Sequence, residues 1–113
     1  MNKKYELTDI TMEYYGVTLH RIKALINFSD VKKGDLGGWI EKECNLSQKG
    51  NCWVYNEAKV YENAGVYENA KVYENAEVYG YAEVHGNSEV YGNSEVYGYA
   101  EIFSGTWKCR SIW

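Results

Sequence analysis

A six-residue repeat, written nine times without a gap between Val54 and Trp107, dominates this sequence. A typical copy is Val-Tyr-Glu-Asn-Ala-Lys, and later copies replace Glu-Asn by Gly-Asn or Gly-Tyr. A strict short period of this kind is the signature of a solenoid, in which each repeat packs against its neighbours. The repeat therefore constrains the shape of the chain far more than its chemistry.

Each hexad predicts a four-residue strand followed by a two-residue corner. The residues Ala-x-Val-Tyr alternate as in a strand with one buried face, so Ala76 and Val78 point inward while Glu77 and Tyr79 point outward. The corner is Glu-Asn, Gly-Asn or Gly-Tyr, and Gly and Asn tolerate the positive φ of tight bends.

Two topologies fit short strands joined by two-residue corners. In an antiparallel meander the residues flanking each turn share a face, which would place Tyr73 beside Ala76 and Val72 beside Glu77. Every face would then mix core and surface residues, against the rule that register keeps one side buried. A coiled β-solenoid, in which all Ala and Val residues face one interior, is the better interpretation.

The Val-x-x-x-Ala/Ser-x hexads resemble those of left-handed parallel β-helix proteins, and the resemblance implies three hexads per triangular turn. The hand comes from the resemblance, since left-handed crossovers are exceptional. Residues eighteen apart are then expected to stack about 4.8 Å apart. The expected outer columns are Tyr55/Tyr73/Tyr91, Tyr61/Tyr79/Tyr97 and Tyr67/His85/Phe103, and the corner columns include Asn69/Asn87 and Asn63/Tyr81/Tyr99.

Residues 1–50 lack the regular hexads and are expected to form an N-terminal β cap with an irregular first coil. The β-helix is expected over 51–107 and a C-terminal tail over 108–113. Strands are predicted at 5–7 and 18–26, and a loop at 30–39. The first strands and Trp39 are expected to seal the first coil. Cys44 and Cys52 are expected to point inward, where a small residue is needed.

The head of the chain carries a second resemblance. The run Gly34-Asp35-Leu36-Gly37-Gly38-Trp39-Ile40-Glu41, followed by 45–47 and 50–55, is similar to the head of a family of short bacterial and prophage proteins with Val-Tyr-Gly-Asn-Ala hexads. This resemblance covers nearly the whole chain but brings no catalytic residues with it.

Charge and cysteine usage narrow the possible partners. Residues 51–113 hold nine Glu against four basic residues, whereas 1–50 hold eight basic and seven acidic ones. Direct nucleic-acid binding is not expected, because phosphate contacts need a basic surface. The acidic surface fits either mimicry of DNA or simple solubility. No signal peptide or membrane span is predicted, and three cysteines fit a reducing compartment, so a bacterial or phage-infected cytoplasm is expected.

Two histidines are the candidates for catalysis. Many left-handed β-helix enzymes are acyltransferases that use a His between subunits of a trimer. The resemblance therefore makes His85 and His20 candidates for a general base. His85, however, replaces Tyr in an outward column, and no insertion shapes a pocket beside it. We therefore predict no catalytic residue, no metal site and no cofactor.

The aromatic surface favours a non-enzymatic binding or assembly module that self-associates, as a trimer or dimer, and presents Tyr and Glu to a protein partner or small ligand. Such a module could be a phage-encoded inhibitor or sponge acting on a host system. The alternatives are a miniature acyltransferase or a piece of a virion or surface fibre. The candidate partner-binding residues are Tyr61, Tyr79, Tyr97, Tyr81, Tyr99, Glu77, Glu83, Glu95 and Glu101, and the candidate oligomer contacts are Trp107, Ile112 and Trp113.

Overall fold

The computed structural model describes residues 3–108 and 111–112, and almost all of its regular structure is β. The strands are β1 (Tyr5–Tyr14), β2 (Val17–Ala24), β3 (Leu36–Ile40), β4 (Trp53–Val54), β5 (Lys59–Val60), β6 (Gly65–Val66), β7 (Lys71–Val72), β8 (Glu77–Val78), β9 (Glu83–Val84), β10 (Glu89–Tyr91), β11 (Glu95–Val96), β12 (Glu101–Ile102), β13 (Thr106–Lys108) and β14 (Ser111–Ile112). A short 3-10 helix, η1 (Glu43–Asn45), interrupts the first coil.

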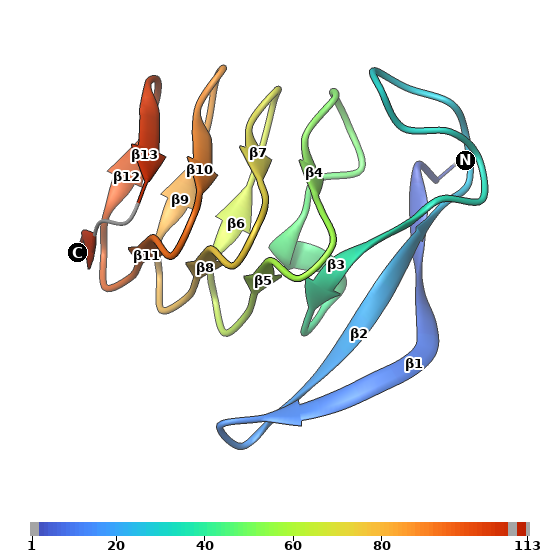
Figure 1. Cartoon of the computed structure of the whole chain (residues 1–113), viewed down its shortest axis with the longest axis horizontal. Coiled ribbons are helices and arrows are strands. Elements are labelled where there is room, and N and C mark those ends of the chain that lie inside the picture. Colours follow the sequence, from blue (N-terminus) through green and yellow to red (C-terminus); the bar gives the residue numbers. More distant parts are fainter. Residues whose placement is uncertain (1–2, 109–110, 113) are drawn as a thin grey trace.

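The short strands stack in parallel as successive coils of a solenoid (Figure 1). Three sheets run along it, in the orders β3-β5-β8-β11-β14, β4-β7-β10-β13 and β6-β9-β12. Lys59 pairs with Glu77 and Glu77 with Glu95, so one turn takes eighteen residues, or three hexads. The predicted all-β parallel solenoid is confirmed, and its turns number about four, where three to four were expected.

The interior is a column of small aliphatic side chains, as the alternation predicts. Val60, Val78 and Val96 are fully buried one above another, and alanines fill the neighbouring column. Where serine replaces alanine, its hydroxyl donates to the backbone carbonyl three residues earlier: Ser88 Oγ lies 2.7 Å from the oxygen of His85. A buried hydroxyl costs little when it is hydrogen-bonded, so the core accepts this exchange.

The corners differ from the prediction in one respect. The residue with positive φ is the first of the corner pair, and in three corners it is glutamate rather than asparagine, with φ between 59° and 62° (Glu62, Glu68 and Glu74). Each of these carboxylates accepts a hydrogen bond from the backbone N–H of the glycine stacked on it in the next coil, as Glu68 Oε1 does from Gly86 at 2.6 Å. The strained backbone thus places an acceptor over an N–H that would otherwise point into solvent.

The head forms a long antiparallel hairpin that joins the first sheet. β1 pairs with β2, β2 pairs antiparallel with β3, and β3 runs parallel to β5. β1 is much longer than the predicted strand at 5–7, and β3 begins at Leu36, inside the stretch predicted as a loop. The hairpin crosses the end of the solenoid and extends beyond its edge (Figure 1).

Two glycines allow β3 to lie tightly against the first coil. A Cβ on Gly37 would stand 2.6 Å from the carbonyl oxygen of Val54, and one on Gly38 would stand 2.6 Å from that of Ala58. Backbone cannot move aside as a flexible side chain can, so both positions need a residue without a Cβ.

The end of the solenoid is sealed by Tyr5 and Trp53, not by Trp39. Tyr5 and Phe28 pack edge-on against the buried Trp53 ring, and the Tyr5 hydroxyl donates to the carbonyl of Leu46 at 2.5 Å. Trp39 instead lies on the outer side of the first sheet, where the Arg21 guanidinium covers its ring at 4.3 Å. Trp39 stands at the outward position of its strand, because it is the next residue, Ile40, that is aligned with the inward Val60.

The expectation for Cys44 is also wrong, whereas that for Cys52 is confirmed. Cys52 is fully buried in the alanine column, but Cys44 is exposed because η1 turns the chain outward there. Asn45 is buried in its place. Its side-chain oxygen accepts from the N–H groups of Glu41 and Lys42, and its amide donates to the carbonyl of Ala64 at 2.8 Å.

Candidate functional site

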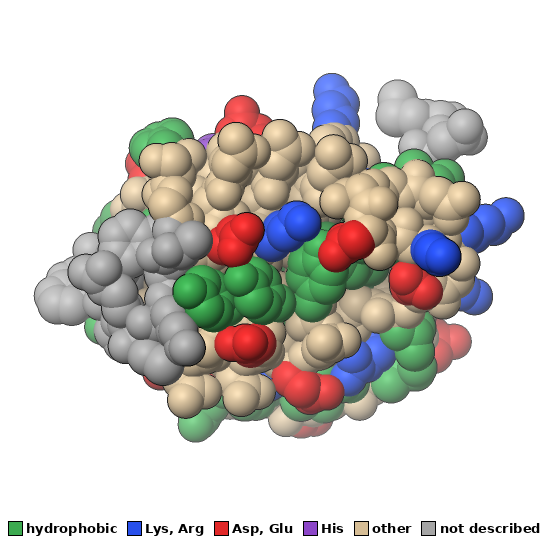
Figure 2. Space-filling view, turned by 45° about the horizontal axis from the view of Figure 1, so that its top comes forward, with side chains coloured by type: hydrophobic (Ala, Val, Ile, Leu, Met, Phe, Trp, Pro, Cys, Tyr) green, Lys and Arg blue, Asp and Glu red, His purple; other side chains and the backbone are tan. Residues whose placement is uncertain are grey.

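Tyrosine and glutamate side chains interlock along the outer faces of the solenoid. The hydroxyl of Tyr79 donates to Glu95 Oε1 at 2.7 Å, and that of Tyr73 donates to Glu89 Oε1 at 2.8 Å, each reaching the next coil. The rings stack in the expected columns, with centroids 5.4 Å apart for Tyr79 and Tyr97. In Figure 2 a band of hydrophobic side chains crosses the visible surface between acidic and basic ones.

The third face, over β6, β9 and β12, departs from this pattern. Residue 65 is glycine, and the Tyr67 ring lies over it, since a Cβ there would fall within 3 Å of the ring and hydroxyl. His85 takes the place of the next tyrosine, stacked between Tyr67 at 4.9 Å and Phe103 at 5.0 Å. The outer face therefore carries one imidazole in an aromatic column.

His85 is paired with a carboxylate. Its Nε2 lies 2.9 Å from Glu83 Oε1, and the side chain keeps 21% of its surface exposed. A carboxylate on one ring nitrogen fixes the tautomer and leaves the other nitrogen to accept a proton. His20 differs, because its Nδ1 faces the backbone oxygen of Thr8 at 3.0 Å on the hairpin. Of the two histidines, His85 has the arrangement of a general base.

The structure brings several predicted partner-binding residues together on the sheet β5-β8-β11. Tyr61, Tyr79 and Tyr97 stack there, and Glu77 and Glu95 pair one coil apart. Tyr61 is only 6% exposed, however, because the hairpin covers it. Little of the Tyr61 side chain is therefore available to a partner.

The remaining predicted residues lie elsewhere. Tyr81 and Tyr99 stack at a corner, 5.1 Å between centroids, with 54% and 78% of their surfaces exposed. Glu83 and Glu101 pair on the sheet that holds His85. For the predicted oligomer contacts, Trp107 lies in β13 and Ile112 in β14, while Trp113 lies outside the described residues.

The sequence interpretation missed two tyrosines at the tip of the hairpin. Tyr14 donates to Glu77 Oε2 at 2.5 Å, and Tyr61 donates to Glu77 Oε1 at 2.9 Å, so this carboxylate ties the hairpin to the solenoid. Burial raises the pKa of Tyr14 and Tyr61 well above the usual range, and their hydrogen bonds to Glu77 raise it further. The available signal was Gly16, since a glycine between two candidate strands allows a tight hairpin turn.

Comparison with known proteins gives one informative similarity. No family model matches the chain. Over 42 residues, or 37% of the chain, it is 48% identical to the uncharacterized acetyltransferase YdcK of Escherichia coli (strain K12), of which it spans 13%.

This similarity corrects the functional prediction. A similar protein named as an acetyltransferase contradicts the non-enzymatic binding module and favours the acyltransferase alternative. The stacked hexads and this partial similarity both fit the broad class of hexapeptide-repeat β-helix proteins. Within the described residues, no helix is long and apolar enough to cross a membrane.

Proposed function

We propose that this chain is an acyltransferase module of the hexapeptide-repeat type, in which His85 is the general base. The observation that carries the proposal is the 2.9 Å contact between His85 Nε2 and Glu83 Oε1 on an outer face of the β-helix. The similarity to a named acetyltransferase supports the reaction class. The donor would be an acyl thioester such as acetyl-coenzyme A, and the acceptor a hydroxyl or amine.

The chemistry follows from the two ring nitrogens. When Nε2–H donates a hydrogen bond to the Glu83 carboxylate, Nδ1 carries the lone pair and takes the proton of the acceptor as that group attacks the thioester carbonyl. The new C–O or C–N bond forms, the C–S bond breaks, and the proton passes from His85 to the departing thiolate. The Glu83 carboxylate orients the ring and stabilises the transient imidazolium.

A second copy of the chain would complete the site. His85 is not among the lining residues of the grooves at Tyr73, Tyr79, Tyr81 and Cys44. Phe103, at one end of the aromatic column, is 61% exposed. A catalytic group outside a groove gains enclosing walls when another surface packs beside it, so we propose that the active form is a homo-oligomer.

The experiment measures thiol release from acetyl-coenzyme A by the whole chain, with a panel of amine and hydroxyl acceptors. His85→Phe is the most informative variant, because Phe103 already occupies the same column and a phenylalanine at 85 keeps the aromatic stacking. Loss of a general base is expected to lower kcat by about 10²- to 10⁴-fold. Glu83→Gln should cause a smaller loss, since the ring keeps a hydrogen-bond acceptor but loses the carboxylate that stabilises the imidazolium.

The control is His20→Asn, a histidine removed from the hairpin, which should leave the rate unchanged. Binding of coenzyme A is followed separately by ligand-observed NMR. The absence of any response at millimolar coenzyme A would overturn the acyltransferase proposal. An undiminished rate in a folded His85→Phe variant would overturn the role of His85 alone.

A further inference from the structure

A groove lies between the tip of the β1–β2 hairpin and the outer face of the sheet β5-β8-β11. We call it the hairpin groove; it has a volume of about 370 Å³. Tyr14 ties the tip down through Glu77 and packs edge-on against Tyr61, 5.7 Å between centroids. The groove is lined by Tyr14, Tyr15, Tyr61, Glu62, Glu77, Tyr79 and Glu95.

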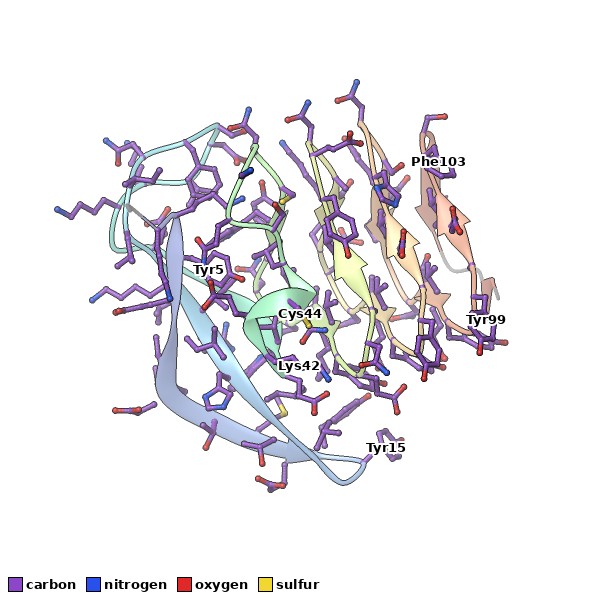
Figure 3. The ribbon with its side chains drawn as sticks, turned by 180° about the vertical axis from the view of Figure 1, so that it is seen from behind. Tyr5, Tyr15, Lys42, Cys44, Tyr99 and Phe103 are labelled. Atoms are coloured by element: carbon purple, nitrogen blue, oxygen red, sulfur yellow. The ribbon has the colours of Figure 1, made fainter. Side chains whose placement is uncertain are left out.

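Tyr15 stands in a backbone conformation that tyrosine rarely adopts. Tyr14 pairs with Val17, so Tyr15 and Gly16 form a two-residue turn with φ of 49° and 85°. Turns with two positive φ values favour Asn-Gly, and a bulky first residue costs energy. Tyr15 is nevertheless 87% exposed at the tip of the hairpin (Figure 3). Its ring lies edge-on to that of Tyr14, 4.6 Å between centroids. Strain that contributes no buried packing indicates a role outside folding.

The groove combines aromatic faces with carboxylates. The tyrosine hydroxyls donate to Glu77 and Glu95, which directs these carboxylates toward the rings. Within the described residues neither Glu62 nor Glu95 forms an ion pair, and each uses only one carboxylate oxygen in a hydrogen bond. Ring faces and free carboxylate oxygens both attract cations.

One lysine of the chain already makes a cation–π contact at this place. Lys59 Nζ lies 5.0 Å from the centre of the Tyr14 ring, beside the groove. It does not line the groove, whose own charged residues are all acidic. The groove therefore has the features of a cation site: several aromatic rings, an unbalanced negative charge and room for a small molecule.

We propose that the hairpin groove binds an organic cation of the alkylammonium class, namely an aliphatic polyamine. Glu77 and Glu95 are neighbours in adjacent coils, about 4.8 Å apart along the ladder. The two Glu77 oxygens accept from Tyr14 and Tyr61, and each oxygen keeps a second lone pair for an ammonium group. Successive ammonium groups of a polyamine, a few methylenes apart, can each meet a carboxylate at this spacing while the methylenes cover the rings. The groove lies on a different sheet from His85, so the inference does not depend on acyl transfer.

The test is calorimetric titration of the whole chain with spermidine. Saturable binding of one spermidine per chain is expected. Tyr15→Asn removes the ring and keeps a residue that accepts positive φ, so the variant should fold and be more stable than the parent. Its affinity should fall by about fivefold or more, the value of a cation–π contact at a partly exposed site. The affinity of the Glu95→Gln variant for spermidine should fall by at least the same factor.

Two variants serve as matched controls. Tyr15→Phe keeps the ring and should bind within about twofold of the parent, since the ring face attracts the cation. Glu89→Gln removes a carboxylate with the same tyrosine hydrogen bond on another sheet, and should also bind normally. Absence of saturable binding would overturn the proposal. So would an equal loss in Glu89→Gln and Glu95→Gln, which would show a diffuse attraction to an acidic surface.

Discussion

The carboxylate of Glu68 accepts a hydrogen bond from the backbone N–H of Gly86, 2.6 Å away in the next coil, although Glu68 itself has a φ of 62°. A positive φ costs an L-residue roughly 1–2 kcal/mol, so the contact offsets a local strain. The two effects can be separated by substitution, because alanine keeps the strain and loses the acceptor, whereas glycine loses both.

Glu68→Ala is expected to lower the free energy of unfolding by about 1–2 kcal/mol, since the N–H of Gly86 loses its acceptor. Glu68→Gly should cost less than Glu68→Ala, because glycine adopts this conformation freely. Urea unfolding measures both, with the exposed Glu101→Ala as control. An alanine variant more stable than the glycine variant would contradict this account.

Gly37→Ala is expected to destabilise the chain by about 1–3 kcal/mol or more, because its Cβ would meet the backbone oxygen of Val54. Leu36→Ala, at the exposed neighbouring position, should cause little change. Thermal unfolding of the two variants gives the comparison. Equal stability would mean that β3 can shift away from the first coil without loss.

High pH should weaken the fold through its tyrosines. Burial, followed by the hydrogen bond to Glu89, raises the pKa of Tyr73 from 10.0 to about 12. The folded chain then holds this proton more tightly than the unfolded chain. The resulting stabilisation is fully present below pH 10 and is lost as the pH rises through about 12.

The tyrosinate absorbance of the folded chain, titrated against pH, measures this effect directly. Tyr79 shifts in the same direction for the same causes, so the loss of stability should be shared between columns. Tyr73→Phe should reduce the slope of stability against pH in this range. A slope unchanged by Tyr73→Phe would show that this hydroxyl is not coupled to folding.

The cysteines should differ sharply in reactivity. Cys44 is exposed, whereas Cys52 is buried and its thiol pKa is raised by burial. In a Cys109→Ser background, a thiol reagent should label Cys44 rapidly and Cys52 only when the chain unfolds. Peptide mass spectrometry along a urea series reads both rates. Labelling of Cys52 in the folded chain would mean that the cap opens locally.

The stacking of the hexads follows from the sequence because inward Val and Ala alternate with outward Tyr and Glu over nine copies. The contacts of the hairpin could not be predicted from the sequence, because residues 8–13 show only a weak alternation. Nothing in these residues indicates that Tyr14 reaches Glu77 in β8. Burial of Tyr61 was missed for the same reason. The pairing of His85 with Glu83 needed the side-chain geometry, because the same spacing also places an outward glutamate two residues before Tyr79, Tyr91 and Tyr97.

Because three hexads make one turn, eighteen residues are the smallest change in chain length that adds or removes a whole coil. A gene that gained or lost eighteen codons would add or remove one complete coil and leave every later side chain on the same face. A change of six codons would move each later residue to the adjacent sheet, so that a deletion before His85 would carry this imidazole to the side of the hairpin. Among variants that differ in repeat number, those that keep the separate faces are therefore expected to differ in steps of eighteen residues.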